Sequence, residues 1–287
     1  MTKHVVSIPS TPFSSASGSF EVHQVPAAQD NLVWLFVCKR TGAVAAVDGP
    51  DAENALAYCQ ANGLKLTHVL NTHTHGDHIG INRDLAQRGL LDALEVIGPA
   101  KVSAQVPGIT QAVDEGDEIQ VGACRARVLL TEGHIEGHIC FLFEDVLFAG
   151  DTLFTGGCGR VFTGDFGAMF RGLSKLRALP GETRVCCAHE YTQDNLAFAS
   201  TLEPDNRALQ ERVAQVNAVR SQGRSAVPGR LAEERATNPM LRWDSPELQR
   251  EVERQSPGVD LSSPQAIFTA TRKLKDSGAY KRAVQAP

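Results

Sequence analysis

The chain has 287 residues, of which 42% are hydrophobic and 21% are charged, a composition typical of a globular protein with room for a substantial core. Its net charge of −5 and its lack of Lys/Arg clusters argue against a nucleic-acid partner. The apolar runs are short and flanked by charges, so we expect no membrane-spanning segment.

The N-terminal part begins with a polar segment and continues as strands. Residues 1–19 are rich in Ser, Thr and Pro and lack the apolar stretch of a secretory signal, so we expect a disordered or loosely attached tail. Residues 20–47 then predict three strands, the clearest at 31–38. Asp51 can cap a helix that reaches about Ala61 and ends at Asn62-Gly63.

The segment 71–79 reads Asn-Thr-His-Thr-His-Gly-Asp-His-Ile and follows an apolar, strand-like run at 66–70. Imidazole and carboxylate groups are natural ligands of divalent metals. In an extended segment, residues two apart point to the same side, so His73 and His75 can bind one ion. The chain can turn at Gly76, so Asp77 and His78 can face a second ion nearby. A helix is expected at 80–88.

Three later apolar runs also end at a metal-ligand side chain. We predict strands near 94–97, 118–121, 125–130, 139–143, 146–149 and 183–188, and a helix near 168–178. His134, Asp151 and His189 follow the strands at 125–130, 146–149 and 183–188. Because ligand sites form at converging strand ends, we expect these residues to complete two metal sites, with the two oxygens of Asp151 as the bridge.

Five other residues are not assigned as metal ligands. His138 competes with His134, but His134 is nearer the strand end, so we expect His138 to orient a ligand. His4, His23 and His68 lack a comparable context and are interpreted as ordinary tail, surface or strand-edge residues. Most of the seven cysteines are expected to be small buried hydrophobes in a reducing cytoplasm. Cys158 is instead interpreted as a loop residue.

Beyond Tyr191 the pattern becomes helical, with breaks at several prolines. Ser245-Pro246 and Ser263-Pro264 are typical of an N-cap followed by proline at the first helical position. The predicted class is therefore α+β. It comprises a β-rich metal-binding domain at 20–191, covered by helices, and a small all-α domain at 192–287.

Two ions with an open coordination position can activate a water molecule as hydroxide at neutral pH. The sequence has no Gly-x-Ser-x-Gly nucleophile motif that would suggest another mechanism. The residues alone therefore predict metal-assisted hydrolysis of a carbonyl or phosphoryl group.

The chain resembles the glyoxalase II (hydroxyacylglutathione hydrolase) family of the metallo-β-lactamase superfamily. The resemblance rests on the histidine motif and on further motifs at 150–154, 157–160, 188–192, 238–242 and 272–276. It implies an αββα sandwich followed by the helical domain. It also implies one ion on His73, His75 and His134 and a second on Asp77, His78 and His189, with Asp151 between them. Zinc is the first expectation, and iron and manganese are also compatible.

The same resemblance implies a small-molecule substrate, a glutathione thioester such as S-D-lactoylglutathione, hydrolysed to D-lactate and glutathione. Separately from the resemblance, we expect a monomer. Asp77 and Asp151 would be the catalytic residues. The glutathione contacts would be made by Arg160, Tyr191, Arg272 and Lys275. Phe162 stands where many family members have a tyrosine, which predicts weaker glutathione binding with hydrolysis intact.

Three alternatives share parts of this pattern. A persulfide dioxygenase would hold one iron on His73, His134 and Asp151, but it gives Asp77, His78 and His189 no metal to bind. A lactonase or β-lactamase would share the metal core without needing Arg272 and Lys275. A binding protein without catalysis would not require the full ligand set.

Overall fold

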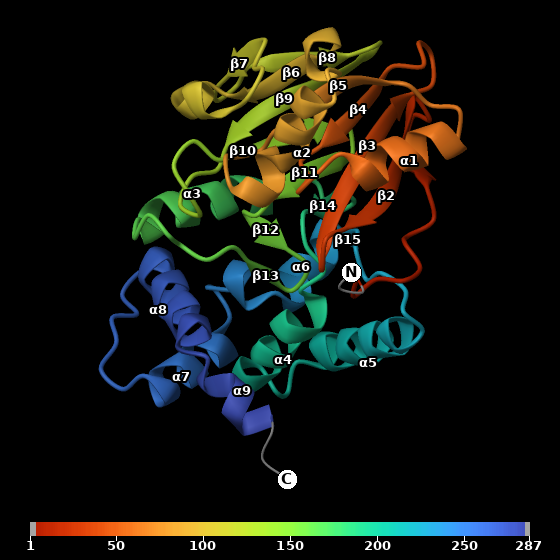
Figure 1. The fold of residues 1–287 in the computed structure, drawn as a ribbon. Coiled ribbons are helices and arrows are strands. Elements are labelled where there is room, and N and C mark those ends of the chain that lie inside the picture. The colour runs from red at the N-terminus through yellow and green to blue at the C-terminus, as the bar shows by residue number, and fades with distance from the viewer. Residues whose placement is uncertain (1–3, 285–287) are drawn as a thin grey trace.

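In the computed structural model, which describes residues 4–284, two β-sheets face each other and helices cover their outer sides (Figure 1). A helical region formed by the C-terminal third of the chain lies against one end of this sandwich. The observed architecture is the predicted αββα sandwich followed by helices.

The first sheet has seven strands in sequence order. Its first four strands are antiparallel, and β4 to β7 run parallel, joined by helical crossovers. Helices α1 (Glu53–Ala61) and α2 (Gly76–Gln87) and the short helices η1 (Leu91–Ala93) and η2 (Ala100–Gln105) belong to these connections. The strands are β1 (Phe13–Ser14), β2 (Phe20–Ala27), β3 (Asn31–Cys38), β4 (Val44–Val47), β5 (Leu66–Leu70), β6 (Glu95–Pro99) and β7 (Gln111–Val113).

The second sheet has six strands in the order β15-β14-β11-β10-β9-β8. Only the β11–β14 pair is parallel, and α3 (Phe166–Arg177) lies in the connection between its strands. β12 (Leu153–Phe154) and β13 (Gly157–Cys158) form a separate hairpin in the same connection. The sheet consists of β8 (Glu118–Val121), β9 (Cys124–Leu130), β10 (Ile139–Phe143), β11 (Val146–Gly150), β14 (Arg184–Cys187) and β15 (Gly229–Arg230).

Strand β3 illustrates why the central strands are almost continuously apolar. Trp34 and Phe36 face the second sheet and belong to the core between the sheets, which also contains Phe143. Val33 and Leu35 face the opposite way, into the cluster that α1 and α2 share with the first sheet. Because alternate residues of a strand point to opposite faces, a strand covered on both sides needs apolar residues throughout.

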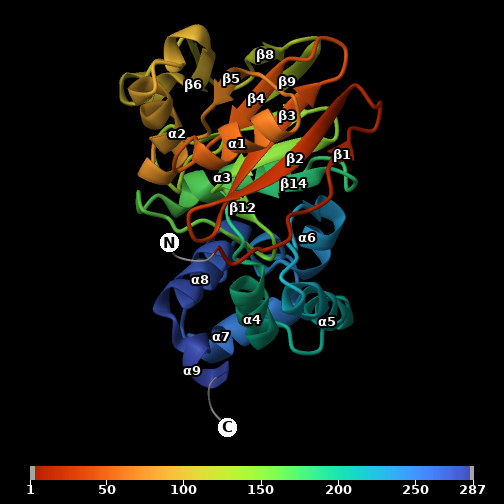
Figure 2. The same cartoon turned by 45° about the vertical axis from the view of Figure 1, so that its right-hand side comes forward.

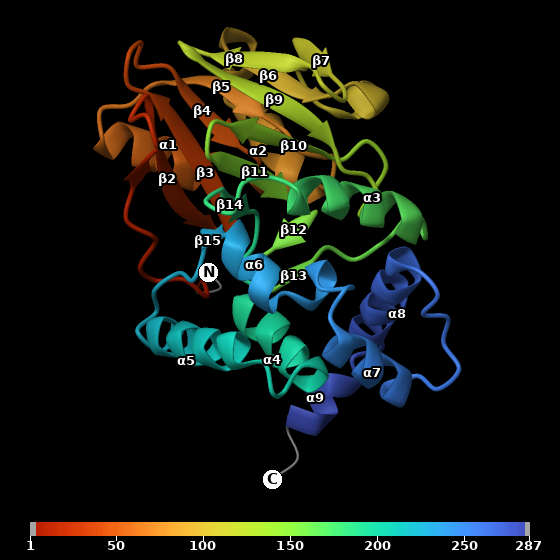
Figure 3. The ribbon, with the colours of Figure 1, turned by 180° about the vertical axis from the view of Figure 1, so that it is seen from behind.

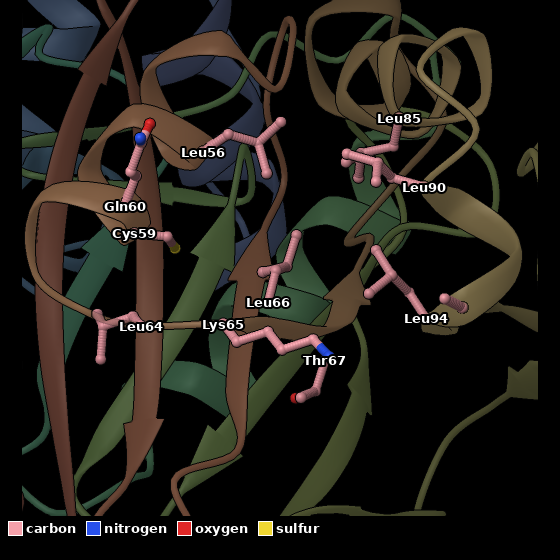
Figure 4. A pocket seen from close by; sticks show the side chains of 11 residues that line it. Leu56, Cys59, Gln60, Leu64, Lys65, Leu66, Thr67, Leu85, Leu90 and Leu94 are labelled. Atoms are coloured by element: carbon pink, nitrogen blue, oxygen red, sulfur yellow. The ribbon is translucent and has the colours of Figure 1, made fainter.

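A leucine-rich pocket of about 410 Å³ opens on the outer face of the first sheet, between α1, β5 and the end of α2 (Figure 4). Its wall includes Leu56, Leu66, Leu85 and Leu94. None of the predicted metal ligands lines this pocket.

The helical region comprises α4 (Thr192–Leu202), α5 (Arg207–Ser221), α6 (Leu231–Thr237), η3 (Pro239–Leu241), α7 (Pro246–Gln255), α8 (Pro264–Ser277) and α9 (Ala279–Val284). It lies at the same end of the sandwich in all views (Figures 2 and 3). Ser245 and Ser263 cap α7 and α8, with proline at the first helical position, as predicted. None of the helices among residues 4–284 is both long enough and apolar enough to cross a membrane.

Two expectations need correction. The tail at 1–19 is not loose over residues 4–19, because Val6 is buried and β1 pairs with β2. Residues 1–3 lie outside the described range, as do 285–287 of the helical region. The helical region is also not purely α, since its short strand β15 extends the second sheet beside β14.

A buried polar cluster joins the helical region to the β12–β13 hairpin. Glu234 on α6 is fully buried and pairs with Arg212 on α5. Its Oε2 accepts hydrogen bonds from the backbone N–H of Gly156 at 2.8 Å and from Asn238 Nδ2 at 3.0 Å. Asn238 Nδ2 also donates to the carbonyl of Gly157 at 3.0 Å, so the Asn238-Pro239 motif holds the hairpin in place.

We predict that Glu234→Gln destabilises the protein by about 3–5 kcal/mol, because it leaves the Arg212 guanidinium buried without a counter-charge. Urea unfolding checks this value, with Glu253→Gln on the exposed side of α7 as the matched control. Equal unfolding midpoints for the two variants would contradict it.

Candidate metal centre

The ends of four strands, β5, β9, β11 and β14, bring the predicted ligands to one edge of the sandwich. His73 and His75 follow β5, and Asp77 and His78 occupy the first turn of α2. His134, Asp151 and His189 follow β9, β11 and β14. All seven predicted metal ligands therefore come together, although they are drawn from segments more than 100 residues apart.

The first group consists of His73, His75, His134 and Asp151. The Nδ1 atom of His75 lies 3.1 Å from Nε2 of His73 and 3.0 Å from Nε2 of His134. The Oδ2 atom of Asp151 lies 3.4 Å from Nε2 of His134. Four ligand atoms thus point at a common centre.

The second group consists of Asp77, His78 and His189. Oδ2 of Asp77 lies 3.4 Å from Nε2 of His189 and 3.8 Å from Nε2 of His78. Oδ1 of Asp151 lies 3.5 Å from both of these nitrogens. The two oxygens of one carboxylate therefore face the two groups separately.

These spacings fit divalent cations. Ligands about 2.1 Å from a tetrahedral ion are separated by about 3.4 Å, close to the distances within both groups. His78 Nε2 and Asp151 Oδ1 are buried and have no hydrogen-bond partner. Since unpaired buried polar atoms are costly, the site calls for cations that satisfy them.

Two further carboxylates hold the imidazoles from behind. Asp48 Oδ2 lies 3.0 Å from Nδ1 of His78, and Asp48 also accepts hydrogen bonds from the backbone and the hydroxyl of Thr72. Asp30 Oδ1 lies 2.9 Å from Nδ1 of His189. Such partners fix the orientation of a ligand imidazole and leave its Nε2 free for a metal.

His138 supports the site as expected. It is fully buried, and its Nε2 accepts the backbone N–H of Asp151 at 3.1 Å. Its Nδ1 lies 3.0 Å from the hydroxyls of Thr131 and Thr152. Because both ring nitrogens are engaged with the protein, His138 orients Asp151, whereas His134 belongs to the first group.

The charges of the site are strongly coupled. Burial and the surrounding imidazoles lower the pKa of His73 well below its usual value, so this side chain is neutral. Burial also opposes charge on His78, but Asp151 and Asp48 outweigh it and raise its pKa to about 9. Burial raises the pKa of Asp77, yet His78 and the hydrogen bond from Asn31 lower it overall. The carboxylates therefore attract positive charge into the site, from a proton or from a metal ion.

A glycine allows the β13 loop to reach the first group. A Cβ atom on Gly159 would lie 2.0 Å from the carbonyl oxygen of Asp151, so only glycine fits there. The next residue, Arg160, accepts a hydrogen bond from Nδ1 of His134 through its backbone carbonyl, at 2.8 Å. Its exposed side chain extends over the ring of Phe162, 5.4 Å from the ring centroid.

Tyr191 lies beside the second group. Its ring stacks on His189 with centroids 4.8 Å apart, and it is 38% exposed. Burial and the charges of Asp30 and Asp151 raise the pKa of Tyr191, so its phenol stays protonated and can donate a hydrogen bond.

The other two predicted substrate residues lie on α8 and already have partners; Arg272 is buried and Lys275 is half-buried. Arg272 donates to the carbonyl of Cys158 at 3.0 Å and to Asp276 at 2.7 Å, which joins α8 to the β13 strand. Lys275 Nζ lies 2.9 Å from a carboxylate oxygen of Asp194. Burial lowers the pKa of Lys275 to about 8 although Asp194 favours its charged form.

Asp48 and Asp30 were absent from the sequence-based prediction. Asp48 follows the apolar strand β4, so the strand-then-ligand pattern that identified Asp151 also applies to it. Asp30 lies in the turn before β3 and carries no comparable signal.

Comparison with known proteins places the chain in a family. The family model described as the metallo-beta-lactamase superfamily matches residues 46–189, and that described as the hydroxyacylglutathione hydrolase C-terminus matches residues 190–278. A hydroxyacylglutathione hydrolase of Methylococcus capsulatus is 47% identical over 89% of this chain and 98% of its own length. A hydroxyacylglutathione hydrolase of Rhodospirillum rubrum is 43% identical over 90% of this chain and 98% of its own length.

Solved structures support the fold. ETHE1 from Myxococcus xanthus aligns with a TM-score of 0.57 at 24% identity, covering 93% of this chain and 98% of that one. The BLEG-1 B3 metallo-beta-lactamase aligns with a TM-score of 0.55 at 19% identity, covering 77% of this chain and 99% of that one. Together, the sandwich, the helical region and the sequence relatives show that the chain belongs to the hydroxyacylglutathione hydrolase family of the metallo-β-lactamase superfamily.

Proposed function

We propose that this protein hydrolyses glutathione thioesters, with S-D-lactoylglutathione as the substrate and D-lactate and glutathione as products. The observation that carries the proposal is the Asp151 carboxylate, whose two oxygens face two separate groups of metal-ligand atoms. The substrate class is supported by relatives named hydroxyacylglutathione hydrolase that align over almost their entire length.

Two divalent ions, with zinc as the first expectation, would be held by the seven predicted ligands. His73, His75 and His134 would bind one, Asp77, His78 and His189 the other, and Asp151 would lie between them. The distances within each group support this division. Asp48 and Asp30 would orient His78 and His189 from behind.

The reaction requires a nucleophile and stabilisation of the thioester oxygen. When bound, the ions would polarise the carbonyl group and lower the pKa of water to about 7. Asp77 is the partly exposed carboxylate of the site, and we assign it acceptance of the water proton at Oδ1, because Oδ2 faces the second group of ligand atoms. A thiol has a pKa of about 8.5, so the glutathione thiolate leaves with little help from a general acid.

Glutathione carries two carboxylates and needs cations and donors at fixed positions. Arg160 and Tyr191 are exposed beside the metal-ligand groups and suit this role. Arg272 and Lys275 would contribute from the helical region, Lys275 by exchanging Asp194 for a substrate carboxylate. The substrate would then lie where the sandwich meets the helices.

The alternatives explain less of the site. A persulfide dioxygenase with one iron on His73, His134 and Asp151 leaves the second converging group without a role. A lactonase or β-lactamase would use the metal core but would give Arg272 and Lys275, in the region matched by the hydroxyacylglutathione hydrolase C-terminus, no role. We further propose that the protein is a monomer and that it is located in the cytoplasm. The seven cysteines are free and buried, which agrees with the reducing environment of that compartment.

We predict that the purified protein hydrolyses S-D-lactoylglutathione. A chelator should reduce the rate of hydrolysis to the uncatalysed rate, and added zinc should restore the activity. Loss of thioester absorbance measures the reaction, and oxygen uptake with glutathione persulfide is measured in parallel. A fully metallated protein that leaves glutathione thioesters intact, or that consumes oxygen instead, would overturn the proposal.

We predict that Asp151→Asn lowers the metal content from about two ions per chain to about one or fewer, because both groups lose their shared charge. Elemental analysis after dialysis measures the content. Asp92→Asn is the matched control, since Asp92 is exposed on η1. Retention of two ions by Asp151→Asn would refute the bridging role.

Phe162 is the departure from the family pattern that the structure makes testable. Its ring is 60% exposed and packs edge-on against His75 and His134, with centroids 5.6 and 5.3 Å away. Because Phe162 is largely exposed beside the metal-ligand groups, we expect a hydroxyl on its ring to reach a substrate bound there.

We predict that Phe162→Tyr lowers KM for S-D-lactoylglutathione about two- to tenfold and leaves kcat unchanged, as expected for one added hydrogen bond. Steady-state kinetics measures both, with Phe13→Tyr on the distant strand β1 as the control. An unchanged KM in Phe162→Tyr would rule out the missing contact.

A further inference from the structure

Two cysteines from opposite sheets lie in contact at the end of the sandwich remote from the metal-ligand groups. Cys38 is the last residue of β3 in the first sheet, and Cys124 is the first residue of β9 in the second. The Cys124 thiol donates to Sγ of Cys38, with the sulfurs 3.6 Å apart. Among the seven cysteines, all within the described residues, this is the only sulfur–sulfur hydrogen bond.

We propose that Cys38 and Cys124 form a reversible disulfide when the protein meets a peroxide, and that this bond joins the two sheets. The sulfurs need to approach by about 1.6 Å to reach bonding distance. Cys124 lines a surface pocket of about 450 Å³ together with Ser19, Lys39 and Arg40, so a small oxidant can reach Cys124. Cys38 is fully buried, and its sulfur lies one contact of 3.6 Å beyond that of Cys124.

The environment of Cys38 stabilises a thiolate. The backbone N–H of Ala123 donates to its Sγ at 3.3 Å, in addition to the thiol of Cys124. Burial raises the pKa of Cys38, but hydrogen bonds from Thr41, Ala123 and Cys124 outweigh this and lower it to about 6. Burial and the contact with Cys38 raise the pKa of Cys124 to about 11. The pair is thus one nucleophilic thiolate beside one protonated thiol.

The other five cysteines lack this combination. Burial raises the pKa of Cys59, Cys140, Cys158, Cys186 and Cys187, which keeps these thiols protonated and unreactive. The difference predicts that oxidation is selective for one pair.

The chemistry balances with hydrogen peroxide as the oxidant. The Cys38 thiolate attacks one peroxide oxygen, the O–O bond breaks, and hydroxide leaves and takes up a proton to become water. Cys124 then attacks the sulfur of the Cys38 sulfenic acid, the S–O bond breaks, and the departing hydroxide takes the Cys124 proton. Overall, two thiols lose two electrons and two protons, and peroxide becomes two waters. A thiol such as glutathione reverses the bond by exchange.

The disulfide should raise the stability of the protein and leave its catalytic activity unchanged. Cys38 is seven residues along β3 from Asn31, which contacts Asp77, so the disulfide would lie about 23 Å from the metal-ligand groups. The two cysteines are 86 positions apart in the chain, and closing so long a loop restricts the unfolded state.

The test treats the purified, metal-containing protein with a few equivalents of hydrogen peroxide, then alkylates it in denaturant for mass spectrometry. We expect the loss of two hydrogens, a Cys38–Cys124 crosslinked peptide, and a Tm that rises by about 5 °C and returns with reductant. Thioester hydrolysis should not change.

Cys124→Ala should lose the crosslink and the reversible Tm rise and trap Cys38 as a sulfenic acid that dimedone labels. Cys59→Ala, the matched control, should oxidise like the unchanged protein. If Cys38 and Cys124 both remain alkylatable after peroxide treatment, or if either pairs with a different cysteine, the proposal is wrong. These readouts are independent of the thioester assay.

Discussion

The site depends on the cost of gathering imidazoles and carboxylates at a buried strand edge without cations to bind them. His78 Nε2 and Asp151 Oδ1 are both buried and have no hydrogen-bond partner in the protein. Each oxygen of the Asp151 carboxylate faces one of the two groups of ligand atoms, so a pair of ions would satisfy both groups at once. This requirement explains why four strands end at the same edge and why each is followed by a ligand side chain.

The surrounding structure keeps these side chains in position. Asp48 and Asp30 hold two imidazoles from behind, and His138 holds the backbone of Asp151. The Asn238 and Glu234 side chains then fix the β12–β13 hairpin, which carries the loop next to Asp151. The helical region therefore supports the geometry of the site, and in the proposed function it would also offer Arg272 and Lys275 to a substrate.

Much of this arrangement was predictable because polar ligands after apolar strands form a local pattern. The converging positions of His134, Asp151 and His189 follow from this pattern directly, whereas the strands at 118–121 and 139–143 were predicted from their apolar residues alone. Helix α2 was expected at 80–88 but begins at Gly76. Its N-cap residue, His75, makes no side-chain capping hydrogen bond, so the sequence carries no capping signal for this start. β12, β13 and β15 have two residues each, too few for a periodic pattern. Residues 4–19 were misjudged because their order comes from tertiary pairing with β2 and not from their composition.

Anomalous X-ray scattering from crystals of the metal-loaded protein tests the central claim most directly. The account predicts two peaks at the strand edge, one within the His73, His75 and His134 group and one within the Asp77, His78 and His189 group, with the Asp151 carboxylate between them. A single peak in fully loaded crystals, or two peaks of which neither contacts Asp151, would contradict it.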